Sequence, residues 1–239
     1  MKKNKINYIN LLLLGTLLVS AGCKKDNYDS PDASLYGKVL DAATGEIVPG
    51  SVSKGQYGRL FLYQLDYGSA NPNAIVSEFN ADGTYENAFI FSGKYKVVPR
   101  EGPWEYTDTL IADVNGRTEK DIKVKPWFTS TITVGTVTAT SVTVSVTCKN
   151  NFPVSAANKT ARVAAVLDIN QQGLNINDYA QRLLTNVEGV SNDIVNTTTY
   201  TYNFTGLTPA TTYYIRGAGR RSTPAYYAYS KTIIVKTAN

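Results

Sequence analysis

This 239-residue chain contains no histidine, so carboxylates are the side chains that could catalyse the hydrolysis of a substrate. Catalytic triads that depend on histidine and histidine metal sites are therefore excluded. Glycoside hydrolysis needs only two carboxylates. The acidic candidates lie in separate turn-like segments, and no spacing brings two of them into one cleft: Glu101, Glu105, Asp108, Glu188 and Asp193. We therefore expect solvated charges, no catalytic residues and no enzyme, although an unrecognised carboxylate pair stays an alternative.

Asn80, Asp82 and Asp121 carry oxygen atoms of the kind that bind calcium. Their spacing matches no calcium-binding loop. The segment 80–83 reads Asn-Ala-Asp-Gly, which favours a tight hairpin turn. We expect neither a metal site nor a cofactor.

Aromatic side chains are the more informative class, with 17 tyrosines and two tryptophans. Flat rings stack on the apolar faces of sugars, while neighbouring polar groups bind the hydroxyls. Two clusters do not follow strand alternation and are predicted to be exposed ligand-binding residues: Trp104 and Tyr106 in GPWEY, and Arg220, Arg221, Tyr226 and Tyr227 in GRRSTPAYYAYS. The alternative is that Trp104 caps a core and that the tyrosines begin a strand. Other aromatics are expected in the core: Phe61, Phe89, Phe91, Tyr95 and Tyr213.

The N-terminus has the features of a signal peptide over residues 1–22. Lysines precede an apolar run over residues 11–19, which is too short to span a bilayer as a mature helix, and small residues precede Cys23. The sequence SAGC resembles the lipobox of bacterial lipoproteins, which implies a diacylglyceryl anchor on Cys23. Residues 23–33 would then form a polar tether, and the membrane is the expected partner through the lipid.

The charge of the remaining chain is nearly balanced. Removal of residues 1–22 with their three lysines reduces the 24 Lys and Arg to 21, against 19 Asp and Glu. No basic stretch is left that would attract nucleic acid, so this partner is not expected. Cys148 would lack a disulfide partner once Cys23 is acylated, and we expect it to be buried in a strand.

Short β-rich runs recur from residue 34 onward, separated by turn residues at intervals of roughly ten, which is typical of a sandwich or barrel. The expected strands cover residues 35–40, 59–63, 74–79, 85–91, 94–99, 108–114, 120–124, 141–147, 161–169 and 232–237. One short helix is expected at 177–184, capped by Asn177 and Asp178. The predicted fold class is all-β, with two tandem β-sandwich domains at 34–128 and 129–239.

Two resemblances support this division. LYGKVLDAATGEIVPG and FNADGTYENAFIFSGKYKVVP resemble the carboxypeptidase-regulatory or transthyretin-like sandwich. GLTPATTYYIRGAGR resembles the corner between strands E and F of fibronectin type III domains, in which the hydroxyl of Tyr213 would bind the backbone a few residues upstream.

The chain from 23 to 237 resembles a family of two-domain lipoproteins of undefined function, encoded in glycan-utilisation loci of Bacteroidetes. The resemblance implies a surface-exposed outer-membrane lipoprotein that captures or presents glycan beside an importer complex. Asp26, Asp29 and Asp32 loosely resemble the signal for surface export in such proteins. A structural spacer or adhesion module that contacts only protein is the alternative function.

Asp108 to Leu110 also fits a short O-glycosylation pattern centred on Thr109.

Overall fold

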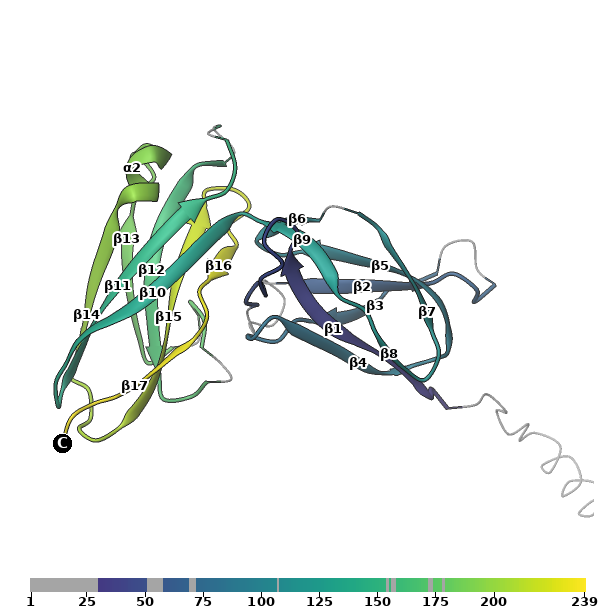
Figure 1. The fold of residues 1–239 in the computed structure, drawn as a ribbon, viewed down its shortest axis with the longest axis horizontal. Helices are drawn as coiled ribbons and strands as arrows, with labels where there is room; N and C mark the ends of the chain where they lie inside the picture. Colours follow the sequence, from purple (N-terminus) through teal and green to yellow (C-terminus); the bar gives the residue numbers. More distant parts are fainter. Residues whose placement is uncertain are drawn as a thin grey trace, which may run out of the picture. The chain divides into compact units, whose positions relative to one another are not determined.

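A computed structural model describes most of the chain, and Figure 1 shows its course. The described residues are 30–50, 58–68, 72–106, 108–153, 155, 158–171, 174–177 and 179–239, with the side chain of Tyr106 excepted. The predicted signal peptide and Cys23 lie outside them. Residues 31–239 form one compact unit. Within the described part, no helix is both long and apolar enough to cross a membrane.

The described chain confirms the predicted all-β class, because strands dominate and helical structure is short. Its first sandwich consists of a sheet in the order β4-β1-β9-β6, with β8 also paired to β1, and a second sheet in the order β3-β2-β5-β7. The strands are β1 (Ala33–Asp41), β2 (Arg59–Gln64), β3 (Ile75–Glu78), β4 (Thr84–Ile90), β5 (Gly93–Glu101), β6 (Trp104–Tyr106), β7 (Leu110–Val114), β8 (Arg117–Glu119) and β9 (Ile122–Pro126).

The core of the first sandwich follows from period-two alternation. In β9, Ile122, Val124 and Pro126 are buried while the two lysines between them are exposed. The inward residues of both sheets meet in one cluster, which includes Leu35, Leu60 and Tyr95 among its members. β1 pairs antiparallel with β4 and parallel with β8 and β9. The N-terminal strand is therefore enclosed by its sheet partners.

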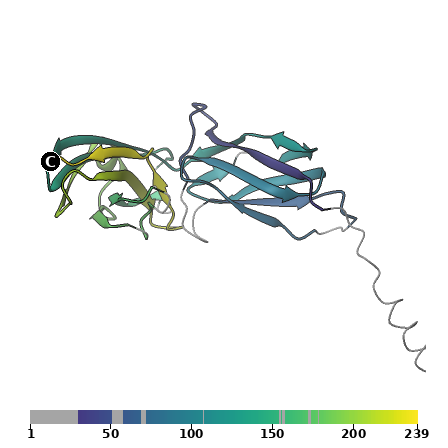
Figure 2. The same cartoon turned by 90° about the horizontal axis from the view of Figure 1, so that it is seen from below.

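The second sandwich has one sheet in the order β10-β11-β14 and another in the order β13-β12-β15-β16, with β17 also paired to β15. Figure 2 shows its strands from a second direction. Its elements are β10 (Phe128–Val137), β11 (Ser141–Asn150), β12 (Thr160–Asp168), β13 (Gln181–Asn186), α2 (Asn192–Thr197), β14 (Thr199–Thr205), β15 (Thr212–Arg221), β16 (Tyr227–Tyr229) and β17 (Ile233–Lys236).

The inner faces of these sheets form a second, larger core. β11 alternates strictly, so that Val142, Val144, Val146 and Cys148 are all fully buried. The full burial of Cys148 confirms its expected place in a strand, and this burial raises the pKa of the thiol to about 12. Tyr202 in β14 reaches the opposite sheet. Its hydroxyl donates to the carbonyl of Val163 at 2.8 Å and lies 3.0 Å from Thr185 Oγ1.

The tyrosine corner is present as predicted. Tyr213 is 5% exposed, and its Oη accepts a hydrogen bond of 2.9 Å from the backbone N–H of Thr208, five residues upstream. This contact ties the start of β15 to the preceding turn. It is the feature that the fibronectin type III resemblance implied.

The expected helix at 177–184 is wrong. Gln181–Asn186 is strand β13, which pairs antiparallel with β12 from Gln181 opposite Leu167. The short helix lies further on, where the Ser191 side chain accepts from the N–H of Ile194 and caps α2. Phe128 begins β10, one residue before the predicted start of the second sandwich. That each sandwich is a separately folded domain stays a prediction.

Candidate ligand-binding pocket

Trp104 does not form the exposed ligand-binding surface predicted for it. β6 pairs with β9 so that Trp104 lies opposite Pro126, and its ring enters the first core with 5% of its surface exposed. The ring packs edge to face on Phe79 at 5.5 Å between centroids, and Nε1 donates to the carbonyl of Pro99 at 3.1 Å. Trp104 is therefore a packing residue with a satisfied indole N–H. Tyr106, the second residue of this cluster, has a side chain outside the described part.

The second predicted cluster is also more buried than expected, because strand β15 continues through Arg220 and Arg221. Arg220 and Arg221 are the last residues of β15, and Tyr227 begins β16 opposite Arg220. Tyr227 is 5% exposed and Arg221 is 4% exposed. Tyr226 is half-buried and stacks on Trp127 with centroids 6.0 Å apart. The four residues therefore lie at one end of one sheet, but Tyr227 and Arg221 do not face solvent.

Arg216 makes a buried structural contact that the sequence analysis did not predict. This β15 residue is fully buried, and its Nη2 donates to the carbonyls of Gly50 at 2.9 Å and Ala81 at 3.4 Å. Its Nε donates to the carbonyl of Ser230 at 3.2 Å. Burial lowers the pKa of the guanidinium to about 10. Arg216 therefore connects the second sandwich to two turns of the first, and no sequence motif marks an arginine for such a contact.

A pocket with a volume of about 450 Å³ lies beside this connection, and we call it the junction pocket. Three segments line it: the chain after β1, the start of β10, and the chain from β16 to β17. Its apolar lining is Ile47, Val48, Pro49, Pro126, Phe128, Ile132, Ala228, Tyr229 and Ile233. Its polar lining is Asp41, Thr44, Glu46, Thr129, Ser130, Thr131, Ser230 and Lys231. Apolar surface and hydroxyl groups are thus combined in one cavity.

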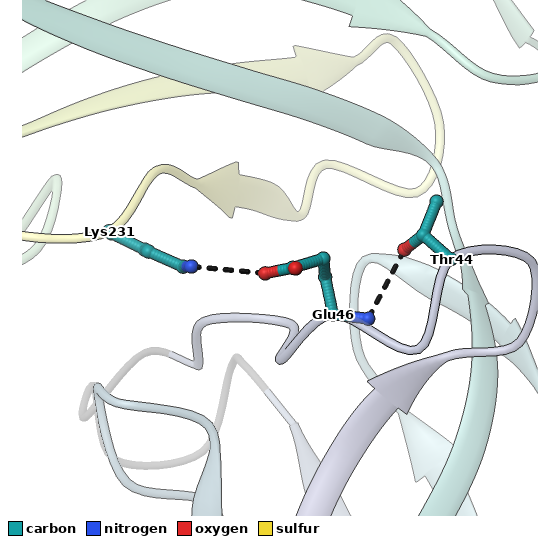
Figure 3. A network of polar contacts seen from close by, with 3 residues as sticks. All are labelled: Thr44, Glu46 and Lys231. Carbon is teal, nitrogen blue, oxygen red and sulfur yellow. Dashed lines mark hydrogen bonds and ion pairs between the residues drawn. The ribbon is translucent and has the colours of Figure 1, made fainter.

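An ion pair between the two sandwiches lies at this pocket (Figure 3). Lys231 Nζ is 3.1 Å from Glu46 Oε2, and both side chains are about 70% exposed. The backbone N–H of Glu46 donates to Thr44 Oγ1 at 3.2 Å, which fixes the turn that carries the carboxylate. An exposed pair of this kind contributes about 0–1 kcal/mol to stability. Its two charged groups are therefore free to exchange partners with a ligand at little energetic cost.

Several of the polar groups in the pocket are already oriented by other contacts. Ser130 Oγ donates to the carbonyl of Ala228 at 3.2 Å, and Asp41 Oδ1 accepts from the N–H of Ala43 at 2.8 Å. Among the described residues, no group of three or more carboxylate or cysteine side chains could hold a metal ion. The arrangement is suited to binding a small molecule with both apolar faces and hydroxyl groups.

The N-terminal sandwich matches a known family. Residues 33–125 fit the model described as "Protein of unknown function (DUF3823) N-terminal domain". The chain has no match among curated proteins.

Solved structures extend the likeness to both sandwiches. A DUF3823 family protein from Bacteroides uniformis is 17% identical, with a TM-score of 0.73 over 87% of this chain and 100% of its own. A DUF3823 family protein from Parabacteroides merdae is 22% identical, with a TM-score of 0.69 over 87% of this chain and 100% of its own. Another Bacteroides uniformis protein, described as a "putative carbohydrate binding protein", is 17% identical, with a TM-score of 0.67 over 86% and 99%. At these identities the likeness shows the fold.

Proposed function

We propose that this protein is a non-catalytic, glycan-binding lipoprotein, because residues 33–125 match the model of the DUF3823 N-terminal domain and the described chain has the fold of solved DUF3823 proteins. The relative from Bacteroides uniformis described in terms of carbohydrate binding supports this choice of ligand. In this proposal Cys23 carries lipid at the outer membrane, and the two sandwiches present glycan at the cell surface to an importer complex.

The junction pocket is the observation that carries the proposal. Its volume of about 450 Å³ lies within the range of small-molecule sites, which runs from about 300 to 1,000 Å³. Phe128 and Tyr229 line it with aromatic rings, and Thr44 contributes a hydroxyl group whose oxygen accepts from the N–H of Glu46. Sugars need both kinds of contact, because their C–H faces are apolar and their hydroxyls require hydrogen-bond partners.

Glu46 and Lys231 give the pocket its specificity in this proposal. A carboxylate accepts hydrogen bonds from two neighbouring hydroxyls, and an ammonium group donates to sugar oxygens. Since the pair is exposed, a ligand that replaces its internal contact does not have to break a buried ion pair.

Calorimetric titration of the mature protein with a panel of neutral oligosaccharides tests the proposal. A retained glycan should bind at least about tenfold more weakly to Glu46→Ala and Lys231→Ala, because each loses charged hydrogen bonds of about 1.5–3 kcal/mol. Glu86→Ala is the matched control, since Glu86 forms an exposed ion pair with Arg117 at 3.7 Å and does not line the pocket. Equal affinities for all three variants and the wild type would exclude the junction pocket as the glycan site.

A further inference from the structure

Arg221 lies close to two aromatic rings at the end of β15. Its guanidinium carbon is 4.1 Å from the centroid of the Trp127 ring and 4.8 Å from that of Phe152. Tyr226 stacks on Trp127 at 6.0 Å and extends the aromatic surroundings. The Trp127 and Phe152 rings lie against a planar group whose hydrogen bonds lie in its plane. The stacking therefore holds the guanidinium in place and leaves its donors to find partners along the edges.

One edge of this guanidinium has no partner in the described structure. Arg221 Nε and Nη2 are both buried without a hydrogen-bond acceptor, and so is the neighbouring Trp127 Nε1. The contrast with Trp104 is informative, because that equally buried indole donates to the carbonyl of Pro99. Buried donors are nearly always satisfied, so three unpaired donors in one cluster indicate that an acceptor is missing.

The geometry of these donors defines the acceptor. Nε and Nη2 project side by side from one edge of the guanidinium, which is the fork that matches the two oxygens of a carboxylate. Among the described residues, no carboxylate forms an ion pair with Arg221. Glu105 acts on Arg221 only through a longer-range electrostatic effect that partly offsets the lowering of its pKa by burial. The cluster therefore has a cation that lacks a bound carboxylate.

The surrounding charge also favours an anion. Lys125 Nζ lies 4.5 Å from the centroid of the same Phe152 ring that covers Arg221. Phe152 is half-buried and follows the end of β11, whereas Trp127 is anchored between β9 and β10. A second cation therefore lies against the same ring that contacts Arg221.

We propose that Arg221, Trp127 and Lys125 form a second binding site, which recognises the carboxylate of a uronic acid. The choice of a sugar acid rests on the proposed glycan-binding function. Arg221 Nε and Nη2 would hold the two carboxylate oxygens, and Trp127 Nε1 would donate to one of them. The Trp127 ring would lie beside the sugar. This site is separate from the junction pocket, whose lining includes none of the three residues.

Calorimetry with glucuronate and galacturonate, against glucose and galactose, tests this site in the mature protein. The uronates should bind and their neutral counterparts should bind at least about tenfold more weakly at this site. Arg221→Lys keeps the charge but removes the fork, and Trp127→Phe keeps an aromatic ring but removes the N–H. Each should weaken uronate binding by about tenfold to a hundredfold.

Arg117→Lys is the matched control, because Arg117 stacks on Tyr36 at 3.8 Å but is exposed and paired with Glu86. It should leave uronate affinity unchanged. Should Arg221→Lys unfold, Trp127→Phe still decides, since it removes the indole donor and leaves the guanidinium of Arg221 intact. Uronate affinity that survives Trp127→Phe with an unchanged melting temperature would overturn the inference, as would equal binding of uronates and neutral sugars.

The two proposals fail separately. Neutral-glycan binding that depends on Glu46 and Lys231, with no uronate binding at Arg221, would remove the second site and leave the proposed function intact. Uronate binding that depends on Arg221, with no effect of Glu46→Ala or Lys231→Ala on any glycan, would support the second site and remove the junction pocket.

Discussion

Tyr202→Phe removes one hydroxyl from the interior of the second sandwich. This hydroxyl connects β14 to the opposite sheet through the carbonyl of Val163 at 2.8 Å and Thr185 Oγ1 at 3.0 Å. An ordinary hydrogen bond contributes about 0.5–1.5 kcal/mol, and a buried acceptor left without a donor costs about 1–3 kcal/mol. Since Tyr202 is only 7% exposed, no solvent replaces the lost partner. We expect the free energy of unfolding at pH 7 to fall by about 1–3 kcal/mol.

The same substitution should change the response to alkaline pH. Burial raises the pKa of Tyr202 from 10.0 to about 12, so the folded protein keeps this proton after the unfolded chain has lost it. The folded state then binds more protons, and the stability contributed by Tyr202 falls as pH rises from 10 toward 12. At pH 10.5 the linkage relation gives a loss of about 0.8 kcal/mol in the wild type. Phenylalanine has no such proton, so the difference in free energy of unfolding between wild type and variant should be smaller at pH 10.5 by that amount.

Urea unfolding of both proteins at pH 7 and pH 10.5 measures both effects. Tyr67→Phe is the control, because Tyr67 is 68% exposed and its hydroxyl remains in solvent in either state. The reasoning is refuted if Tyr202→Phe is as stable as the wild type at pH 7, or if its stability deficit is unchanged or larger at pH 10.5. A change in the denaturant slope would indicate instead that the compactness of one state has changed.

Two further outcomes are expected. The Cys148 thiol, fully buried and with its pKa raised to about 12, should not react with iodoacetamide in the folded protein at pH 8 and should react at once in urea; labelling at equal rates in both states would contradict its burial. Labelled palmitate should enter the full-length wild type in cells but not Cys23→Ala, which should appear in the soluble fraction, and label retained by the variant would remove the assignment of the lipid anchor.

Features that depend on local sequence were predictable. The tyrosine corner is specified by residues within one turn of Tyr213, and its hydrogen bond to Thr208 formed as expected. Cys148 lies in a strictly alternating stretch, so its burial followed from the period of a strand. The hairpin at Asn80–Gly83 also formed, with Gly83 N donating to the carbonyl of Asn80 at 3.0 Å.

Features that depend on pairing register were not predictable. Phe89 was expected in the core, but it is 81% exposed and its neighbour Ile90 is buried. The register of β1 against β4 shifts between Ala33 and Leu35, opposite Ile90 and Asn87, so β4 holds an extra residue there. Such a bulge exchanges the inward and outward faces of the residues after it. Phe91 is exposed for the same reason, at 38%.

The junction pocket was beyond sequence reasoning for a different reason. Its lining comes from residues 41–49, 126–132 and 228–233, and no local pattern brings these segments together. The Glu46–Lys231 pair joins residues that are 185 positions apart. Likewise, the burial of Trp104 depends on the pairing of β6 with β9, which no residue within GPWEY specifies.

The parallel pairing of β1 with β8 and β9 constrains how the first sandwich can fold. Ser34 pairs with Arg117, and Val39 pairs with Ile122, so each contact closes a loop of more than 80 residues. Loops of this length form slowly, because their closure entropy is lost before the contact is gained. During synthesis from the N-terminus, β1 must wait until β9 has been made before its sheet is complete. We therefore expect the first sandwich to fold late and cooperatively, with β1 an unpaired strand edge on one side until then.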